Sequence, residues 1–302
     1  MTAVTRKKVR HHTMRREQAI TYSVMTLPGL VLYCVFLILP ILMGIYYSLT
    51  DWTGIGTNYN FIGVDNYVKV LTNDKRFGNA LIFNLRYTVF LVAGIVIIGF
   101  ILAMLLNREM KGRSFFRTLY FMPAVLSMIT IGLVFKQVYF YVLPSIGKAV
   151  GSVTFSENII ANRKLAIYGI LFVHLWQGVA LPTLLFLAGL QTIPADLYEA
   201  ASIDGANGWH QFKSITVPYM MPTLSVVLVL AVKQGLNVFD YINSMTKGGP
   251  GGATTSIAML IWQNAWERNR FSYAIAQAVI TGLLIAVISF IQIKYTNGKK
   301  VE

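Results

Sequence analysis

Six long stretches without a charged side chain constrain this chain more than any other feature of its sequence. They are residues 18–50, 87–107, 118–135, 165–195, 214–232 and 271–293. A hydrocarbon layer about 30 Å thick is crossed by about 20 helical residues, and each stretch is that long or nearly so. The stretches lack the alternation of a membrane β-barrel, and backbone groups in lipid must pair internally. The sequence therefore predicts an all-α membrane protein with six transmembrane helices.

The low charge content excludes other classes. Charged residues make up 13% of the chain, whereas a soluble domain carries about 25%. This composition excludes a disordered chain and argues against a soluble enzyme.

The first stretch follows a basic segment, as a signal peptide does, but it is too long and no small-x-small cleavage site follows Leu49. We expect a basic arm over residues 1–27 and an uncleaved first helix from about Pro28 to Leu49. Residues 28–302 then form one six-helix domain. The single cysteine, Cys34, lies inside the apolar run and is predicted to be a buried small side chain.

Lysine and arginine orient the helices. With the N-terminus inside, the inner segments hold 14 of these cations and the outer loops hold 9. The short inner loop at residues 108–117 weighs most, because its four cations lie next to spans. Both termini are therefore predicted to be cytoplasmic. A net charge of +14 then needs no nucleic acid, because basic cytoplasmic segments on anionic lipid explain it.

Four charged side chains lie inside or beside the predicted spans: Arg86, Lys136, Lys233 and Asp240. Charges at this depth usually face protein or a water-filled cavity. All four are near helix ends, so they could equally extend to the membrane interface. Both interpretations stay open from the sequence.

The cytoplasmic loop before the fifth span has unusually clear turn chemistry. Thr192 is predicted to cap a short helix with Pro194 near its first turn. Gly205 suits a left-handed helix stop, and Asn207 can cap a second short helix. Pro218 is expected to reset the chain before the fifth span.

An alanine-rich surface on this loop lets another backbone approach closely, which favours docking in a groove of a partner protein. The alternative is an amphipathic hairpin lying on lipid. Lys213 is the loop's only cation, and interfacial helices usually carry several, which disfavours that alternative.

The loop, at about residues 192–218, resembles the EAA loop of permeases from binding-protein-dependent ABC importers. Val217 stands where leucine is usual, which is a mild apolar change. The matching residues, which the resemblance implies couple the permease to an ATPase, are Glu199, Ala200, Ala201, Asp204, Gly205, Ala206, Phe212, Ile215 and Pro218.

Other segments resemble the maltose/glycerol-phosphate type of these permeases. They are Leu39-Pro40, residues 47–52, residues 61–67, Phe121-Met122-Pro123, and residues 239–250 with Thr254-Thr255. The likeness thus covers most of the chain and narrows the class to carbohydrate importers.

The resemblance implies a non-catalytic permease subunit in a bacterial or archaeal cytoplasmic membrane. Its partners would be a second, usually different, six-helix permease, two ATP-binding subunits, an extracellular solute-binding protein and a carbohydrate. The chain has no G-x-x-x-x-G-K-[ST] phosphate loop, so it is expected to bind no cofactor, with ATP and Mg on the partner ATPase. A phosphodiester or polyol permease is the alternative within this class.

A carbohydrate pathway needs polar groups that bond hydroxyls, together with aromatic faces. Any single candidate is more readily explained by a helix–helix hydrogen bond than by a sugar contact. The lone His174 is more readily explained as a structural hydrogen-bond donor than as a proton relay. The candidates in or beside the spans are Asn84, Gln137, Trp176, Gln177, Gln234, Asn237, Asp240, Tyr241, Gln263, Asn264 and Gln277.

Two other classes lack their defining residues. An ion-coupled carrier needs acidic side chains at mid-span, and none occurs in the six stretches. A membrane-embedded enzyme would need a motif such as H-E-x-x-H or G-x-S-x-G, which is absent. The four histidines lack metal-ligand spacing, so no metal site is predicted.

Overall fold

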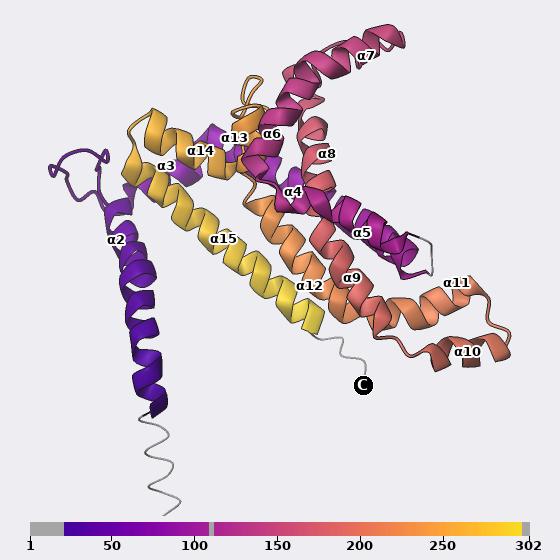
Figure 1. Ribbon diagram of the computed structural model, residues 1–302. Coiled ribbons are helices and arrows are strands. Elements are labelled where there is room, and N and C mark those ends of the chain that lie inside the picture. The colour runs from indigo at the N-terminus through magenta and orange to yellow at the C-terminus, as the bar shows by residue number, and fades with distance from the viewer. Residues whose placement is uncertain (1–20, 109–111, 298–302) are drawn as a thin grey trace, which may run out of the picture.

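A computed structural model describes residues 21–108 and 112–297 of the chain, and within them the regular structure is helical apart from one isolated bridge between Thr50 and Phe61 (Figure 1). The first helix covers Thr21–Ser48. The named elements are η1 (Cys34–Ile38), α2 (Leu39–Ser48), α3 (Asp65–Thr72), α4 (Lys75–Asn107), α5 (Arg113–Phe121), η2 (Met122–Val125), α6 (Met128–Gln137), η3 (Val138–Val142), α7 (Leu143–Ala149), η4 (Ile159–Ala161), α8 (Ala166–Gly178), α9 (Ala180–Gln191), α10 (Ala195–Ile203), α11 (Gly208–Gln211), η5 (Phe212–Thr216), α12 (Val217–Leu236), α13 (Asp240–Met245), α14 (Ile257–Trp262), η6 (Gln263–Glu267) and α15 (Phe271–Asn297).

The described residues contain five helices long and apolar enough to cross a membrane, and the bent pair α8–α9 makes a sixth when counted as one span. The number agrees with the six predicted spans, but the third span-length helix covers Met128–Ala149, whereas residues 118–135 were predicted. The lower end of the first helix, the end of α15 and the α10–α11 hairpin all lie toward the same end of the molecule (Figure 1). The predicted basic arm lies mostly outside the described residues.

The centre of the fold is α4, which packs against α9 and α12. Tyr87, Leu91 and Phe186 have no exposed surface in this core. Small residues bring the helices together, as is usual in membranes. An added Cβ on Gly235 would lie 2.8 Å from the Thr88 Cα, so α4 and α12 touch backbone to backbone at that point.

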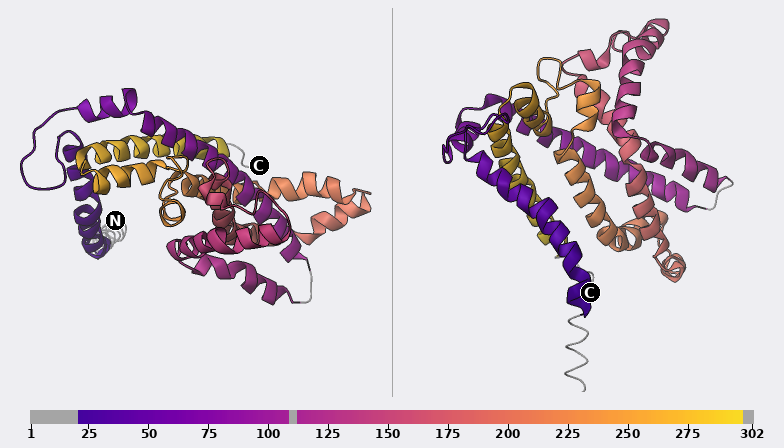
Figure 2. Two further views of the ribbon diagram at one scale, coloured as in Figure 1. Left: turned by 90° about the horizontal axis from the view of Figure 1, so that it is seen from above. Right: turned by 60° about the vertical axis from the view of Figure 1, so that its left-hand side comes forward.

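The first helix stands apart from this centre. It is already helical at Thr21, earlier than the predicted start at Pro28. Its main packing partner is α15 (Figure 2). Ser48 is the only buried residue of α2. Cys34 is exposed, so the prediction of a buried side chain is wrong for this chain alone, because no described segment covers the helix at that position.

Two of the predicted spans are interrupted, and a third break in the helix follows the predicted fifth span. The third breaks at Leu126 and Ser127, which are extended between η2 and α6, after Pro123 has removed one backbone donor. The fourth bends by 45° between α8 and α9. The fifth ends as α12 at Leu236, and the chain becomes helical again at Asp240.

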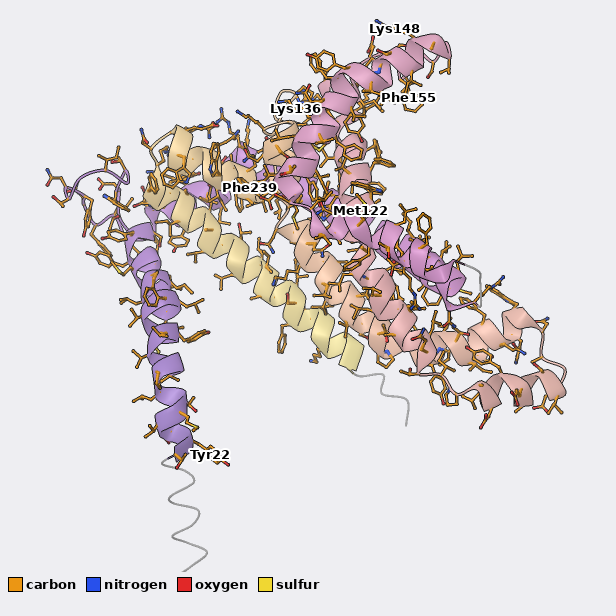
Figure 3. All side chains as sticks on the ribbon, in the orientation of Figure 1. Tyr22, Met122, Lys136, Lys148, Phe155 and Phe239 are labelled. Carbon is orange, nitrogen blue, oxygen red and sulfur yellow. The ribbon has the colours of Figure 1, made fainter. Side chains whose placement is uncertain are left out.

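Beyond its break, the third span continues from α6 through η3 into α7 and forms an arm that projects from the core, with Lys148 and Phe155 near its tip (Figure 3). The far end of the first helix carries Tyr22, on the opposite side of the molecule (Figure 3).

Candidate functional site

The loop between the fourth and fifth spans forms a helical hairpin of α10 and α11. Gly205 has a left-handed φ of 78°. The Ala206 N–H donates to the Ala201 carbonyl at 2.9 Å, and the Gly205 N–H donates to the Ser202 carbonyl at 3.1 Å. This pair of bonds is the Schellman arrangement that ends a helix. The predicted stop at Gly205 is therefore confirmed.

The two arms of the hairpin are bonded to each other. The Asn207 side-chain Oδ1 accepts the His210 N–H at 2.9 Å, which confirms the predicted cap. The Gln211 amide donates to the Ser202 hydroxyl at 2.9 Å, and the hydroxyls of Tyr198 and Thr216 are 2.9 Å apart. The hairpin can therefore move as one unit.

Two details of the predicted loop are wrong. The Thr192 hydroxyl donates to the Gly189 carbonyl at 2.7 Å, so it does not cap α10, and Pro194 occupies the cap position. Pro218 does not reset the chain. The helix runs without a stop from α11 through η5 into α12. Pro218 lies in the first turn of α12 and Pro222 lies inside α12. Neighbouring groups in membrane helices compensate for the bond that a proline removes.

The tip of the hairpin is exposed. The α10 helix has no buried residue, and Ile203 and Trp209 are 87% and 72% exposed. Glu199 and Asp204 are exposed, and within the described residues neither carboxylate forms a hydrogen bond or ion pair. Large apolar side chains beside unpaired carboxylates are typical of a surface that contacts another protein.

A shallow groove of about 430 Å³ lies along this tip. Its lining comes from both arms and includes Ala201, Asp204, Gly205, Ala206, Asn207, His210, Gln211, Ser214 and Ile215. Glu199 and Ala200 are exposed on α10 outside the groove.

Three predicted coupling residues face the core side. The Phe212 ring lies 6.0 Å from the Phe100 ring of α4, Ile215 packs against the core, and Pro218 is half-buried. The structure thus divides the coupling set into an exposed part and a part that connects to the spans.

Polar side chains join the three span breaks. The Gln177 amide donates to the Leu126 carbonyl at 2.7 Å, and the Tyr241 hydroxyl donates to the Gln177 carbonyl oxygen at 2.6 Å. The Tyr241 ring lies 4.5 Å from the His174 ring, and the His174 Nδ1 is 3.0 Å from the Tyr87 hydroxyl. We call Tyr87, His174, Gln177 and Tyr241 the polar junction.

Several other predicted pathway residues hold helices together. The Asn84 amide donates to the Leu236 carbonyl and its oxygen accepts the Ile257 N–H, both at 2.8 Å. The Asn264 amide donates to the Gln277 oxygen at 2.7 Å. Asn84, Asn264 and Gln277 are buried, so their groups are committed to these contacts.

The remaining predicted pathway residues keep accessible surface. Gln137, Trp176 and Asn237 are exposed, and Gln234, Asp240 and Gln263 are half-buried. The Gln263 amide reaches the Lys247 carbonyl at 3.4 Å.

Asp74 organises one end of α4 and was missed from the sequence. One carboxylate oxygen caps α4 through the N–H groups of Arg76 and Phe77, at 3.0 and 3.1 Å. The other accepts the Tyr273 hydroxyl at 2.8 Å and the Gln277 amide at 3.0 Å. An aspartate just before an apolar helix is a cap signal, but its link to α15 has no sequence signal.

No group of three His, Cys, Asp or Glu residues that could hold a metal ion occurs in the described parts of the chain.

The apolar spans define a multi-pass membrane protein, with a helical hairpin continuous with one span. The chain belongs to the family of binding-protein-dependent transport system inner membrane components, whose family model matches residues 95–297.

Several relatives are named as sugar permeases. The chain is 43% identical to the multiple sugar-binding transport system permease protein MsmF of Streptococcus mutans, over 89% of this chain and 92% of that protein. It is 33% identical to the trehalose/maltose transport system permease protein MalF of Thermococcus litoralis, over 92% of this chain and 94% of that one. Such relatives are transport subunits, so the chain is a permease and not an enzyme.

Solved structures share the fold. A chain of a bacterial ABC transporter involved in the import of the acidic polysaccharide alginate matches with a TM-score of 0.81 at 21% identity, over 95% of this chain and 98% of that one. A chain of the alginate transporter in complex with an alginate pentasaccharide-bound periplasmic protein matches with a TM-score of 0.76 at 22% identity, over 95% of both chains.

Proposed function

We propose that this chain is the permease subunit of an ATP-driven importer that carries a mono- or oligosaccharide across a bacterial or archaeal cytoplasmic membrane. An extracellular solute-binding protein delivers the sugar, and ATP with Mg is bound by separate ATPase subunits. The observation that carries the proposal is the exposed hairpin that continues into a span. The sugar names of the relatives support the substrate class.

The hairpin would couple ATP to transport. Glu199, Ala200 and Asp204 lie exposed on α10 or at its end, where they can enter a cleft of the ATPase. The Gly205 turn and the Gln211 bonds keep the two arms together. Since α11 continues through η5 into α12, a push on the hairpin tilts a span. ATP binding then favours one of two states of the pathway.

The sugar would pass near the helix breaks. Interrupted helices expose backbone groups that can replace water around a polar solute. Trp176 and Asn237 lie beside two of these breaks and are exposed. Trp176 offers an aromatic face, and Asn237 offers a carbonyl oxygen, because its amide already donates to the Lys233 carbonyl at 3.0 Å. The polar junction would hold the breaks in place around the sugar.

The first helix would pack against a second permease. The most apolar 18 residues of this helix include no buried residue within this chain, and Tyr22 is 66% exposed. A second six-helix permease would cover part of this surface and lipid the rest. No nucleic acid is needed.

The test is a pull-down of the tagged chain from detergent-solubilised native membranes, with mass spectrometry of the recovered proteins. We expect an ATPase subunit, a second permease and a solute-binding protein. The reconstituted assembly should take up a sugar only with ATP, and a panel of saccharides, polyols and phosphodiesters identifies the substrate. Recovery of the chain alone, with uptake driven by a proton gradient, would overturn the proposal.

A further inference from the structure

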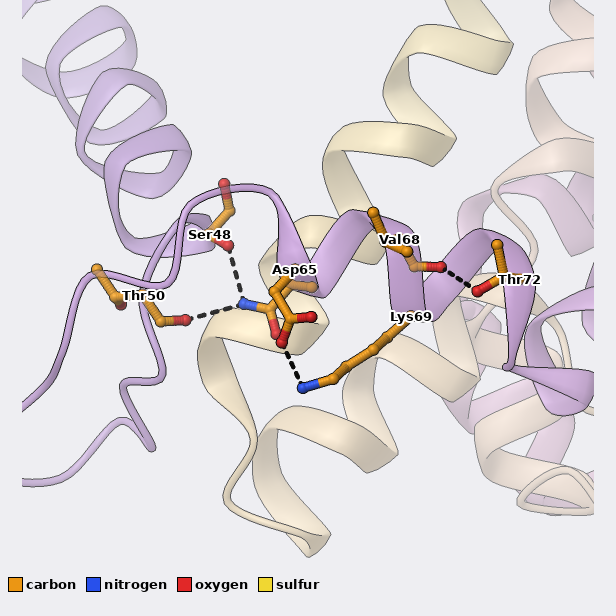
Figure 4. Close-up of polar contacts among 7 residues, drawn as sticks. Ser48, Thr50, Asp65, Val68, Lys69 and Thr72 are labelled. Atoms are coloured by element: carbon orange, nitrogen blue, oxygen red, sulfur yellow. Dashed lines mark hydrogen bonds and ion pairs between the residues drawn. The ribbon is translucent and has the colours of Figure 1, made fainter.

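The first helix is held to the rest of the chain at one end by a small polar cluster. Asn66, on α3, is 6% exposed. Its amide nitrogen donates to the carbonyls of Ser48 and Thr50, both at 2.9 Å (Figure 4). The hydroxyls of Thr50 and Ser272 are 2.9 Å apart. We call Ser48, Thr50, Asn66 and Ser272 the first-helix joint.

The joint satisfies groups that the end of a helix leaves unpaired. The last carbonyls of an α-helix have no partner inside the helix, and Ser48 is the last residue of α2. Ser48 and Thr50 have no exposed surface, so water cannot pair these carbonyls. The Asn66 amide supplies both bonds.

The joint also connects the first helix to α15. The Ser272 N–H donates to the Trp52 carbonyl at 3.1 Å. The Ser48 hydroxyl is 2.6 Å from the Tyr67 hydroxyl on α3. The first helix, α3 and α15 are therefore bonded together at one point.

Residues 21–43 of the first helix are exposed, so this part of the helix can act as a lever about the joint. It has 28 residues, which makes it about 42 Å long at 1.5 Å per residue. A tilt of about 10° at the joint would therefore move its far end by about 7 Å. Side-chain contact requires heavy atoms within about 4.5 Å, so such a tilt would separate the far end from a neighbouring protein.

We propose that Asn66 is a positioning residue that sets the direction of the first helix for pairing with the second permease. The inference rests on the proposed function, since that function supplies the partner. Replacement of Asn66 by aspartate removes the two N–H donors and places a carboxylate against two carbonyl oxygens with almost the same side-chain shape. The helix end would turn to expose those oxygens, and the far end would leave its partner.

The test compares Asn66→Asp with Asn73→Asp in the tagged chain, co-expressed with its partner proteins. Asn73 follows α3 and is exposed, so it is the matched control. The first readout is the amount of second permease recovered per tagged chain. The second is the alkylation rate of Cys34 by N-ethylmaleimide in detergent, because Cys34 is the only cysteine and lies in the middle of the first helix.

We expect Asn66→Asp to reduce the recovered permease about tenfold, as for the loss of a buried hydrogen-bonding group. Cys34, slow to react in the wild-type assembly, should react as fast as in the chain expressed without a partner. Asn73→Asp should match the wild type. Capture of the ATPase should be unchanged, because it depends on the hairpin, which lies far from the joint. Unchanged capture would show that the variant is folded.

Normal permease recovery and a protected Cys34 in Asn66→Asp would overturn the inference and leave the proposed function intact. Recovery of no second permease with the wild-type chain would overturn the proposed assembly and this inference with it. If Asn66→Asp also fails to capture the ATPase, that variant is misfolded, and Thr50→Val tests the positioning role instead. Thr50→Val removes the hydroxyl contact to Ser272, so we expect a smaller reduction in the recovered second permease. Unchanged recovery in this variant would refute the positioning role.

Discussion

Gly205→Ala is the sharpest perturbation of the proposed coupling hairpin. The φ of Gly205 is 78°, and an added Cβ would meet no atom within 4 Å. The substitution therefore introduces no clash, and its whole effect is the backbone cost of a left-handed conformation. That cost is about 1–2 kcal/mol for a residue with a Cβ, which corresponds to a change of about 5- to 30-fold in an equilibrium constant.

The cost falls on the docked state. A free hairpin can relieve the strain by opening its turn, because the tip is exposed and opening it breaks solvent-exposed hydrogen bonds such as that from Gln211 to Ser202. Docking in the ATPase requires the closed turn, so the alanine lowers the affinity for the ATPase by about 5- to 30-fold. Gly205→Asn should have a smaller effect, because asparagine tolerates the left-handed region better.

Gly208→Ala is the matched control. Gly208 lies in the same hairpin, has an ordinary φ and also has open space around an added Cβ. The assay titrates the purified ATPase onto the permease in lipid nanodiscs and measures Kd, with binding-protein-stimulated ATP hydrolysis as the functional readout. Wild-type affinity in Gly205→Ala, or an equal loss in both variants, would refute the reasoning.

Three further substitutions test the spans. Gln177→Leu leaves the Tyr241 hydroxyl and the Leu126 carbonyl without partners, so uptake should fall at least about tenfold. The Kd for the ATPase should stay normal, and normal uptake would contradict a role for the polar junction. Asn84→Leu removes bonds to two other segments and should lower the free energy of unfolding by about 1–3 kcal/mol, seen as a lower Tm in detergent. Gly235→Ala forces two helix backbones apart and should destabilise by about 1–3 kcal/mol, whereas Gly282→Ala, with open space, should leave Tm unchanged.

The positions of the spans could be predicted from the sequence, but their continuity could not. Hydropathy registers composition over about 20 residues and is insensitive to a short interruption. The break at Leu126 and Ser127 lies in an apolar run with Pro123 before it, and the bend near Val179 is marked by Gly178 and Pro182, but neither signal lowers the hydropathy of its stretch. Packing and the Gln177 bond hold these interruptions, and both depend on residues far away in the chain.

The hairpin was predictable because its signals are local. Gly205 and Asn207 act through backbone groups within a few residues. The expected cap at Thr192 failed for an equally local reason, since its hydroxyl found the Gly189 carbonyl one turn back. Asn84, by contrast, bonds Ile257, 173 residues later, and no pattern in a single sequence reveals that pair.

Hydrogen-bond satisfaction separates the polar residues of the spans into two roles. Asn84 and Gln277 are buried and have protein partners on both ends of their amides, so contact with a sugar would require breaking those bonds at a cost of about 1–3 kcal/mol for each group left unpaired. Trp176 and Asn237 are exposed at the edges of the breaks and can meet a sugar without that cost. In the proposed pathway the second group would line the path and the first would hold it open, which accounts for the density of amides in this part of the chain. Because α12 ends beside Asn237, a displacement of α12 would change the lining of the proposed pathway.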